Sequence, residues 1–223
     1  VDTRLTLDGT PFLLIDTAGL RHRRKVRDPV DLFAMSRTLQ AIARCDVALL
    51  VLDATQGVTR DDQRITDQVA ERGRGLVLLV NKWDLVKGGR ERSLPEAIRR
   101  TLRPAMGSPV IAVSAKTGYQ VPRILREARR VGQALERGLS ETECRALIQA
   151  AWKSQPLPRF RGRPVKLRSV RWTNGPPPPT AELFISPVGW LPLPLRRAIQ
   201  KRFALHPRLP GVTVRLIITA AKP

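Results

Sequence analysis

Residues 76–84 read Leu-Val-Leu-Leu-Val-Asn-Lys-Trp-Asp, and this stretch decides the fold. Five apolar residues stand together, and polar residues able to bind a ligand follow at once. An uninterrupted apolar run of this length indicates a strand buried on both faces, which is typical of a parallel sheet. A second such run, residues 47–52, ends at Asp53. Two buried strands, each followed by polar residues, predict an α/β fold with a ligand site at the carboxyl edge of the sheet.

The segments around these two runs alternate between strand and helix patterns. Apolar residues at helical spacing separate the predicted strands, and a turn at residues 8–10 joins the first two. This alternation predicts a mostly parallel sheet with helices on both faces. The expected strands are 3–7, 12–15, 47–52, 76–80 and 110–113, and the expected helices are 30–44, 61–72, 94–102 and 121–137.

A second unit is expected from residue 139 onward. Ser140 and Glu143 have the spacing of a capping box, which predicts a helix that runs to about Lys153. Strands at 165–172, 182–185 and 212–218 and a helix at 195–203 follow, so the order is αββαβ. The apolar alternation of the first of these strands changes phase at Ser169, which indicates a β-bulge.

The charge of the chain points to an anionic partner. The 223 residues carry 40 Lys and Arg against 19 Asp and Glu, a formal net charge of +21, and residues 140–223 hold 15 basic but only three acidic side chains. We expect RNA contact through six basic residues with no acid among them, Arg159, Arg161, Arg163, Lys166, Arg168 and Arg171. The alternative is a solvated basic face that reflects an Arg-rich composition.

Composition also excludes several classes of protein. No apolar run approaches the roughly 20 residues of a membrane span. Cys45 and Cys144 provide neither a disulfide framework nor a zinc site, so we expect a reducing, cytoplasmic setting. We expect Trp152, Trp172 and Trp190 to pack in the core rather than to stack on bases.

The polar residues after the predicted strand 76–80 suit guanine. Asp84 offers two acceptors to the adjacent N1–H and N2 donors of that base, which adenine lacks, and a site built for this pairing discriminates strongly. Asn81 is expected to bond the base or to brace neighbouring loops, and the stem of Lys82 to cover the base plane. The alternative is an ordinary polar loop.

Two further segments also follow predicted strands. Asp16-Thr17-Ala18-Gly19 places a carboxylate where it can hold Mg²⁺ through water, and lets the amide of Gly19 approach a phosphate. Ser114-Ala115-Lys116 offers a backbone N–H to guanine O6. Each of these two signals is weak by itself, but together with residues 81–84 they occur in the right order, each at the end of a strand.

Together these segments resemble the motifs of translation-factor-like GTPases, and most closely the second G domain of the tandem ribosome-assembly GTPases called Der or EngA. The resemblance rests on residues 14–21 (Leu-Ile-Asp-Thr-Ala-Gly-Leu-Arg), 81–84 and 161–167 (Arg-Gly-Arg-Pro-Val-Lys-Leu), and it extends over essentially the whole chain. It implies a P-loop-type G domain over residues 1–138 and a basic KH-like domain over residues 139–223.

The resemblance also implies a function. It implies a switch that binds and hydrolyses GTP during assembly of the large (50S) ribosomal subunit, with that subunit and its rRNA as partners. It implies GTP or GDP and Mg²⁺ as cofactors, with K⁺ near the phosphates, and we expect a monomer with no membrane partner. The nucleotide contacts carried over are Asp16, Thr17, Ala18, Gly19, Leu20, Asn81, Lys82, Trp83, Asp84, Ser114, Ala115 and Lys116.

The sequence departs from the family pattern in three ways. It contains no G-x-x-x-x-G-K-[ST] loop and no threonine segment to cover the γ-phosphate, so we expect an N-terminally truncated fragment that is inactive alone. The absent first strand would lie between the strands at 12–15 and 47–52. Leu20 stands where many regulatory GTPases have a glutamine that orients water.

The third departure is that no two glycines stand three residues apart, so the G-x-x-G clamp of RNA-binding KH domains is absent. This favours electrostatic contact with rRNA over sequence reading, and it argues against a related GTPase with a true KH domain. A degenerate G domain that scaffolds a basic RNA-binding module without catalysis remains the alternative.

Overall fold

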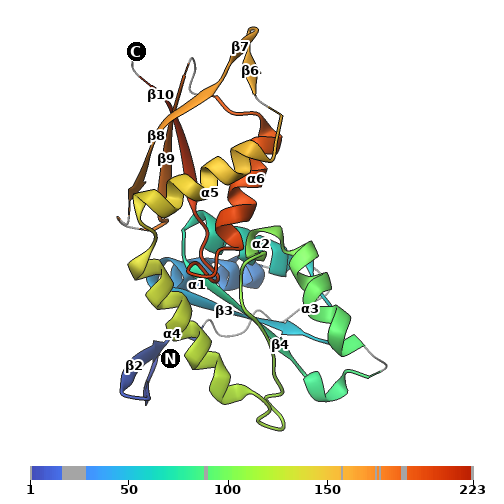
Figure 1. Cartoon of the computed structure of the whole chain (residues 1–223). Helices are drawn as coiled ribbons and strands as arrows, with labels where there is room; N and C mark the ends of the chain where they lie inside the picture. Colours follow the sequence, from blue (N-terminus) through green and yellow to red (C-terminus); the bar gives the residue numbers. More distant parts are fainter. Residues whose placement is uncertain are drawn as a thin grey trace.

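The structure, a computed structural model, describes residues 2–16, 29–87, 90–156, 158–173, 175, 177–186 and 190–221. The predicted parallel sheet is confirmed (Figure 1). It has the order β3 (Val47–Asp53), β4 (Gly75–Asn81), β5 (Val110–Ala112), and both neighbouring pairs are parallel. Because β4 is central, the first six of its seven residues are buried.

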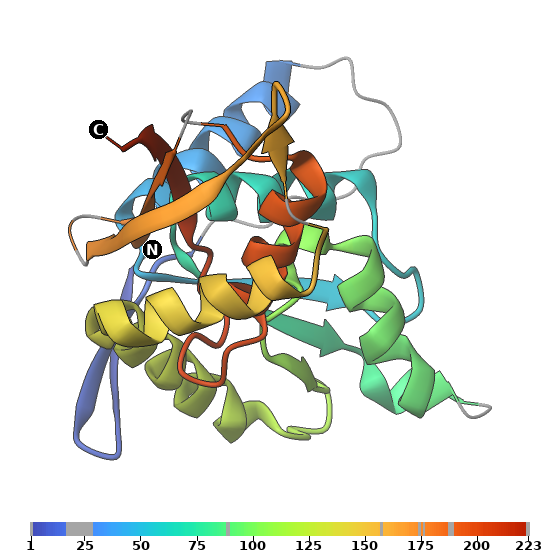
Figure 2. The same ribbon diagram turned by 45° about the horizontal axis from the view of Figure 1, so that its top comes forward.

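Helices cover both faces of this sheet, as predicted (Figure 2). Leu76, Leu78 and Val80 face one way, toward α1 (Pro29–Arg44), α2 (Arg60–Glu71) and α3 (Arg90–Thr101). Val77 and Leu79 face the other way, toward α4 (Val121–Arg137). Two 3-10 turns, η1 (Trp83–Leu85) and η2 (Arg103–Ala105), flank α3. The alternation of side chains along a single strand therefore builds two apolar clusters.

The first two strands form a separate hairpin. β1 (Thr3–Leu7) pairs antiparallel with β2 (Thr10–Leu14), so the second strand begins two residues earlier than expected. Asp8 and Gly9 both have positive φ, the geometry of a tight two-residue turn. Among the described residues, β2 pairs only with β1 and β3 only with β4. Within the described ranges, β2 and β3 therefore each have one edge with no strand partner.

The C-terminal region has its own sheet and core. β8 (Lys166–Thr173) pairs antiparallel with β9 (Thr180–Ser186), which pairs parallel with β10 (Arg215–Ala220). α5 (Glu141–Lys153) and α6 (Leu193–Ala204) lie on one face of this sheet (Figure 1). A G-type α/β domain with a parallel sheet is thus followed by a C-terminal domain, as predicted.

The sequence predicted the β-bulge of this region but not its short hairpin. The bulge is confirmed, because the register of β8 against β9 shifts between Leu167 and Ser169. A short hairpin of β6 (Arg159–Phe160) and β7 (Arg163–Pro164) was not predicted. Strands of two residues have no periodicity to detect. Only the turn residues, Arg161 and Gly162, both with positive φ, mark the hairpin.

Backbone hydrogen bonds join the two regions directly. The amide of Leu76, at the start of β4, donates to Gly211 O (3.0 Å), and the amide of Gly211 donates to Gly107 O (2.9 Å). Gly211 has a φ of +67°, and a Cβ there would lie 2.3 Å from Leu76 O. Only glycine allows this approach, so the C-terminal region is attached to the central strand at the end opposite Asn81.

Candidate functional site

The polar residues after β4 and β5 come together, because parallel neighbouring strands end at the same edge of a sheet. Asn81 is the last residue of β4, and Ser114 follows β5 by two residues. Between Asn81 and the turn η1, Lys82 adopts a left-handed conformation with a φ of 62°. This reversal turns the chain sharply and presents Asp84 at the sheet edge.

Asn81 braces the two loops against each other. Its Oδ1 accepts hydrogen bonds from the amide of Lys82 (2.8 Å) and from the amide of Ala115 (3.0 Å), which lies 34 residues away. The amide of Trp83 donates to Val113 O (3.1 Å), and the Trp83 ring packs against the core. The bracing role expected for Asn81 is therefore what the structure shows.

Asp84 is held by a serine from the other loop. The Ser114 hydroxyl, which is buried, donates to Asp84 Oδ1 (2.6 Å) and accepts from the amide of Thr117 (3.2 Å). Asp84 itself is exposed. No described residue donates a hydrogen bond to its Oδ2, and Oδ1 keeps a second lone pair. The carboxylate is oriented yet can still accept two donors from a ligand.

Lys82 is tied to the neighbouring strand. Its Nζ lies 2.7 Å from Oδ2 of Asp53, the last residue of β3, which also accepts from the amide and hydroxyl of Thr55. Burial alone would raise the pKa of Asp53, but the hydrogen bonds from Lys82 and Thr55 outweigh it and lower the pKa to about 2. The sequence offers no local signal that would pair Asp53 with Lys82, because the two residues belong to different strand ends.

Two amides of the third segment, residues 114–116, are hydrogen-bonded within the protein. The amide of Ser114 donates to Tyr119 O (3.1 Å), and that of Ala115 to Asn81. Contact between one of these amides, or that of Lys116, and guanine O6 stays a prediction. The segment 81–84 and the segment 114–116 nevertheless form one hydrogen-bonded frame.

The Asp16 segment is only partly described. Asp16 is exposed and follows β2 by two residues. Thr17, Ala18, Gly19 and Leu20 lie outside the described residues, so their contacts with phosphate stay predictions. Among the residues that the structure describes, no three His, Cys, Asp or Glu side chains form a metal cluster. The Mg²⁺ assignment therefore depends on the chemistry of Asp16 alone.

The basic residues of the C-terminal region that the structure describes all lie on the surface. Arg159, Arg161 and Arg163 belong to the small hairpin, and all six predicted contacts are exposed. Regular alternation would send about half of a strand's residues inward. The bulge in β8 corrects the phase, so Lys166, Arg168 and Arg171 all stay outside while Val165 and Val170 are buried.

Comparison with known proteins decides the family. The model of the elongation factor Tu GTP-binding domain matches residues 32–144, half of the chain. The chain belongs to this GTP-binding domain family. Membership implies a guanine nucleotide as ligand, which agrees with the carboxylate geometry at Asp84.

Curated relatives extend the match beyond the GTP-binding domain. GTPase Der of Desulforudis audaxviator is 34% identical over 220 residues, covering 97% of the chain, and GTPase Der of Heliobacterium modesticaldum is 34% identical over 98% of it. GTPase Der of Caldanaerobacter subterraneus is 32% identical over 83%. These proteins are homologues, and the predicted Der-type resemblance is confirmed. The chain spans about half the length of these relatives.

A solved structure supports the fold. Era in complex with MgGDPNP and nucleotides 1506–1542 of 16S ribosomal RNA has a TM-score of 0.50 at 14% identity, and the match covers 97% of the chain and 78% of Era. At this identity the match concerns the fold alone. Separately, none of the helices in the described part of the chain has the length and apolar character needed to span a bilayer.

Proposed function

We propose that this chain carries the guanine-recognition half of a GTP-hydrolysing switch that acts in assembly of the large ribosomal subunit in the cytoplasm. In this proposal residues 1–138 bind GTP or GDP with Mg²⁺, and K⁺ assists near the phosphates. Residues 139–223 bind rRNA. The base contacts are those of 81–84 and 114–116, and the phosphate contacts those of 16–20.

One observation carries the nucleotide assignment. The hydroxyl of Ser114 and the side chain of Asn81 lock two strand-end loops together, and the carboxylate of Asp84 is left oriented at the surface. A polar loop without a ligand has no need for an exposed carboxylate held by a buried hydroxyl. Fixed acceptors that match the N1–H and N2 donors are what guanine selection requires.

The RNA assignment is supported by charge. The six exposed basic residues of the C-terminal region have no acidic residue among them, and phosphate contacts dominate the affinity of most RNA-binding surfaces. The structurally similar protein Era was solved with 16S ribosomal RNA bound. For this chain, the large-subunit target is proposed from the resemblance of its motifs to those of the Der or EngA GTPases.

The test of nucleotide choice needs a phosphate-binding loop, since the 223 residues contain no G-x-x-x-x-G-K-[ST]. A chimera in which the strand, loop and helix that bear this motif in a Der relative precede Val1 should bind GDP at least about 1,000-fold more tightly than ADP. Calorimetric titration measures both affinities. Equal affinities would contradict the assignment of Asp84.

The competing proposal is a G domain that serves only as a scaffold, and the missing loop motif favours it. Residues 1–223 by themselves should show no measurable GTP turnover, because the lysine and amides that hold the β-phosphate are missing from this sequence. The chimera separates the proposals. Turnover that rises when K⁺ replaces Na⁺ supports the switch, whereas tight GDP binding with no turnover supports the scaffold.

A further inference from the structure

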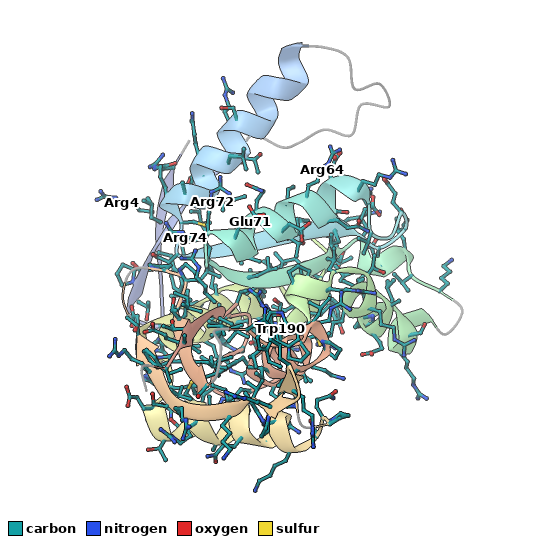
Figure 3. All side chains as sticks on the ribbon, turned by 90° about the horizontal axis from the view of Figure 1, so that it is seen from above. Arg4, Arg64, Glu71, Arg72, Arg74 and Trp190 are labelled. Carbon is teal, nitrogen blue, oxygen red and sulfur yellow. The ribbon has the colours of Figure 1, made fainter. Side chains whose placement is uncertain are left out.

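Trp190 lies on the surface, although its sequence context led us to expect it in the core. Its exposed fraction is 46%, although the other two tryptophans of this region, Trp152 and Trp172, are partly buried against the core. Trp172 packs 5.9 Å from Phe203, centroid to centroid. Figure 3 looks onto the end of the molecule that carries the β6–β7 hairpin and labels Trp190 there. An exposed indole that the core does not use is available to a ligand.

The hairpin supplies a second ring. The Phe160 centroid lies 6.2 Å from that of Trp190, with 52° between the ring planes. The hairpin holds Phe160 in this position, because a two-residue turn fixes the register of the strands beside it. The exposed indole and the partly buried Phe160 ring form an aromatic pair from segments 30 residues apart in sequence.

Positive charge lies beside this aromatic pair. The guanidinium carbon of Arg161 lies 5.5 Å from the Phe160 centroid. Arg163 pairs directly with Phe160 across the hairpin, so the side chains of Arg163 and Phe160 lie on the same face of the hairpin. Arg196 and Arg197 are exposed on the first turns of α6, which begins at residue 193. The sequence has no Asp or Glu between residues 143 and 182, or after 182.

We propose that the exposed Trp190 indole, supported by Phe160, stacks on an unpaired base of single-stranded RNA, while Arg161 and Arg163 hold the adjacent phosphates. This rests on the proposed RNA-binding role of the C-terminal region and adds a base contact to what charge alone would give. Aromatic rings beside arginines recognise splayed-out bases, because every base has a π-face and the arginines neutralise the backbone. An acidic protein segment would use the arginines but has no equivalent use for the exposed indole.

The test compares RNA with and without bases. The probes are a fluorophore-labelled oligoadenylate of about 12 nucleotides and an abasic ribose-phosphate strand of the same length, titrated by anisotropy with residues 1–223. The Trp190→Ala variant should bind oligoadenylate roughly 5- to 150-fold more weakly than the parent chain and should bind the abasic strand equally well. The dependence of log Kd on log salt should not change, because no charge is removed.

Matched variants make the result decisive. Leu193→Ala removes another exposed apolar side chain, three residues along the chain and 56% exposed, and should leave both affinities unchanged. Trp190→Phe keeps a stacking ring and should retain most of the oligoadenylate affinity even if Trp190→Ala melts at a lower temperature. Arg163→Gln should weaken both probes and lower the salt slope.

Three outcomes would overturn the proposal. They are unchanged oligoadenylate binding by Trp190→Ala, equal loss for both probes, and binding of a polyglutamate peptide that depends on Trp190. If the parent chain binds both probes alike with a steep salt dependence, the rRNA-binding role stands and the base contact alone is wrong. If it binds neither probe nor rRNA, the RNA-binding role itself fails.

Discussion

Asp53 and Asp84, two carboxylates at the carboxyl edge of the β3–β4–β5 sheet, have different partners and therefore different roles. Asp53 is paired with Lys82 and bonded to Thr55, so its charge is used within the protein. Asp84 accepts a hydroxyl donor from Ser114 and is otherwise directed to solvent. The neutral Ser114 hydroxyl orients the Asp84 carboxylate and leaves its negative charge uncompensated. The ion pair with Lys82 instead neutralises the charge of Asp53. Only Asp84 is thus equipped for an external ligand.

Replacing Asp84 by asparagine should relax base selection. In the P-loop chimera, Asp84→Asn should lower the preference for GDP over ADP by about 100-fold, because an amide cannot accept both the N1–H and N2 donors. Calorimetry with both nucleotides measures the change. Asp61→Asn, on α2, is the control and should leave the ratio unaltered. A ratio that stays high in Asp84→Asn would show that guanine is selected elsewhere.

The ion pair of Asp53 and Lys82 should make stability depend on acid pH. The pKa of Asp53 is lowered in the folded state to about 2, so its contribution is full above the unfolded pKa near 4 and is lost as the pH falls toward 2. Asp53→Asn should reduce the free energy of unfolding by about 1 kcal/mol at pH 7, a small value because Lys82 is half-exposed.

Urea unfolding at pH 7, 4 and 2.5 tests this. The gap between the parent chain and Asp53→Asn should narrow between pH 4 and 2.5. A gap of the same size at all three pH values would mean that the asparagine acts through packing rather than through the ion pair.

At the scale of elements, reciprocal caps fix where two helices begin. The Thr59 hydroxyl accepts from the amide of Asp62 (3.2 Å) at the start of α2, and the Asp62 carboxylate accepts from the amide of Thr59 (2.8 Å). Ser140 and Glu143 make the same exchange at the start of α5. Buried Leu139 and Cys144 flank this second cap, at the two positions of a hydrophobic staple.

Removing the second cap should destabilise the C-terminal region. Ser140→Ala should cost about 1 kcal/mol of unfolding free energy, because the amide of Glu143 loses its acceptor. Thr142→Ala, an exposed change two residues along the same helix, is the control and should cost less than about 0.5 kcal/mol. Urea midpoints with unchanged m-values measure both. Equal effects would indicate that helix propensity, and not the cap, sets the stability.

At the scale of the whole molecule, glycines let two separately built regions share backbone bonds. A Cβ on Gly107 would lie 1.7 Å from Ala204 O, and one on Gly73 would lie 2.2 Å from the Cα of Pro178. These contacts and the Leu76–Gly211 bond join the nucleotide domain to the C-terminal domain. The two are therefore expected to unfold as one cooperative unit.

Gly211→Ala should uncouple the domains. It adds a Cβ 2.3 Å from Leu76 O at a φ of +67°. Gly57→Ala is the matched control, since it has a φ of +74° with nothing within 4 Å and should cost only about 1–2 kcal/mol from backbone strain. Calorimetric melting should give one transition for Gly57→Ala and two for Gly211→Ala. A single transition in both would show that the interface tolerates the added carbon.

Charge reversal should identify the RNA-binding face. With Arg161, Arg163 and Lys166 changed to Glu, binding of residues 1–223 to large-subunit rRNA should weaken more than about tenfold. The slope of log K against log salt should fall by roughly 2 to 3. The control reverses three exposed basic residues of the nucleotide domain, Arg92, Arg100 and Arg103. If both triple variants behave alike, net charge rather than this patch governs binding.

The sequence by itself determined the features that depend on neighbouring residues. The apolar runs at 47–52 and 76–80 predicted two buried strands, the helix of residues 121–137 was placed to the residue, and the cap at Ser140 was found. The position of residues 81–84 at the carboxyl edge of the sheet also followed. These signals are local, because a buried strand and a helix cap can both be recognised from the residue types at a few adjacent positions.

Only the tertiary structure decided the contacts between distant segments. Asp84 and Ser114 are 30 residues apart, and nothing in either loop specifies that the hydroxyl will orient the carboxylate. The exposure of Trp190 could not be predicted from the sequence. The β6–β7 hairpin beside it is too short to show a periodic pattern, and other side chains form the core of this region. The type of a residue limits the interactions that it can make. Which partner it contacts, and therefore which role it has, depends on how the sheets and helices pack.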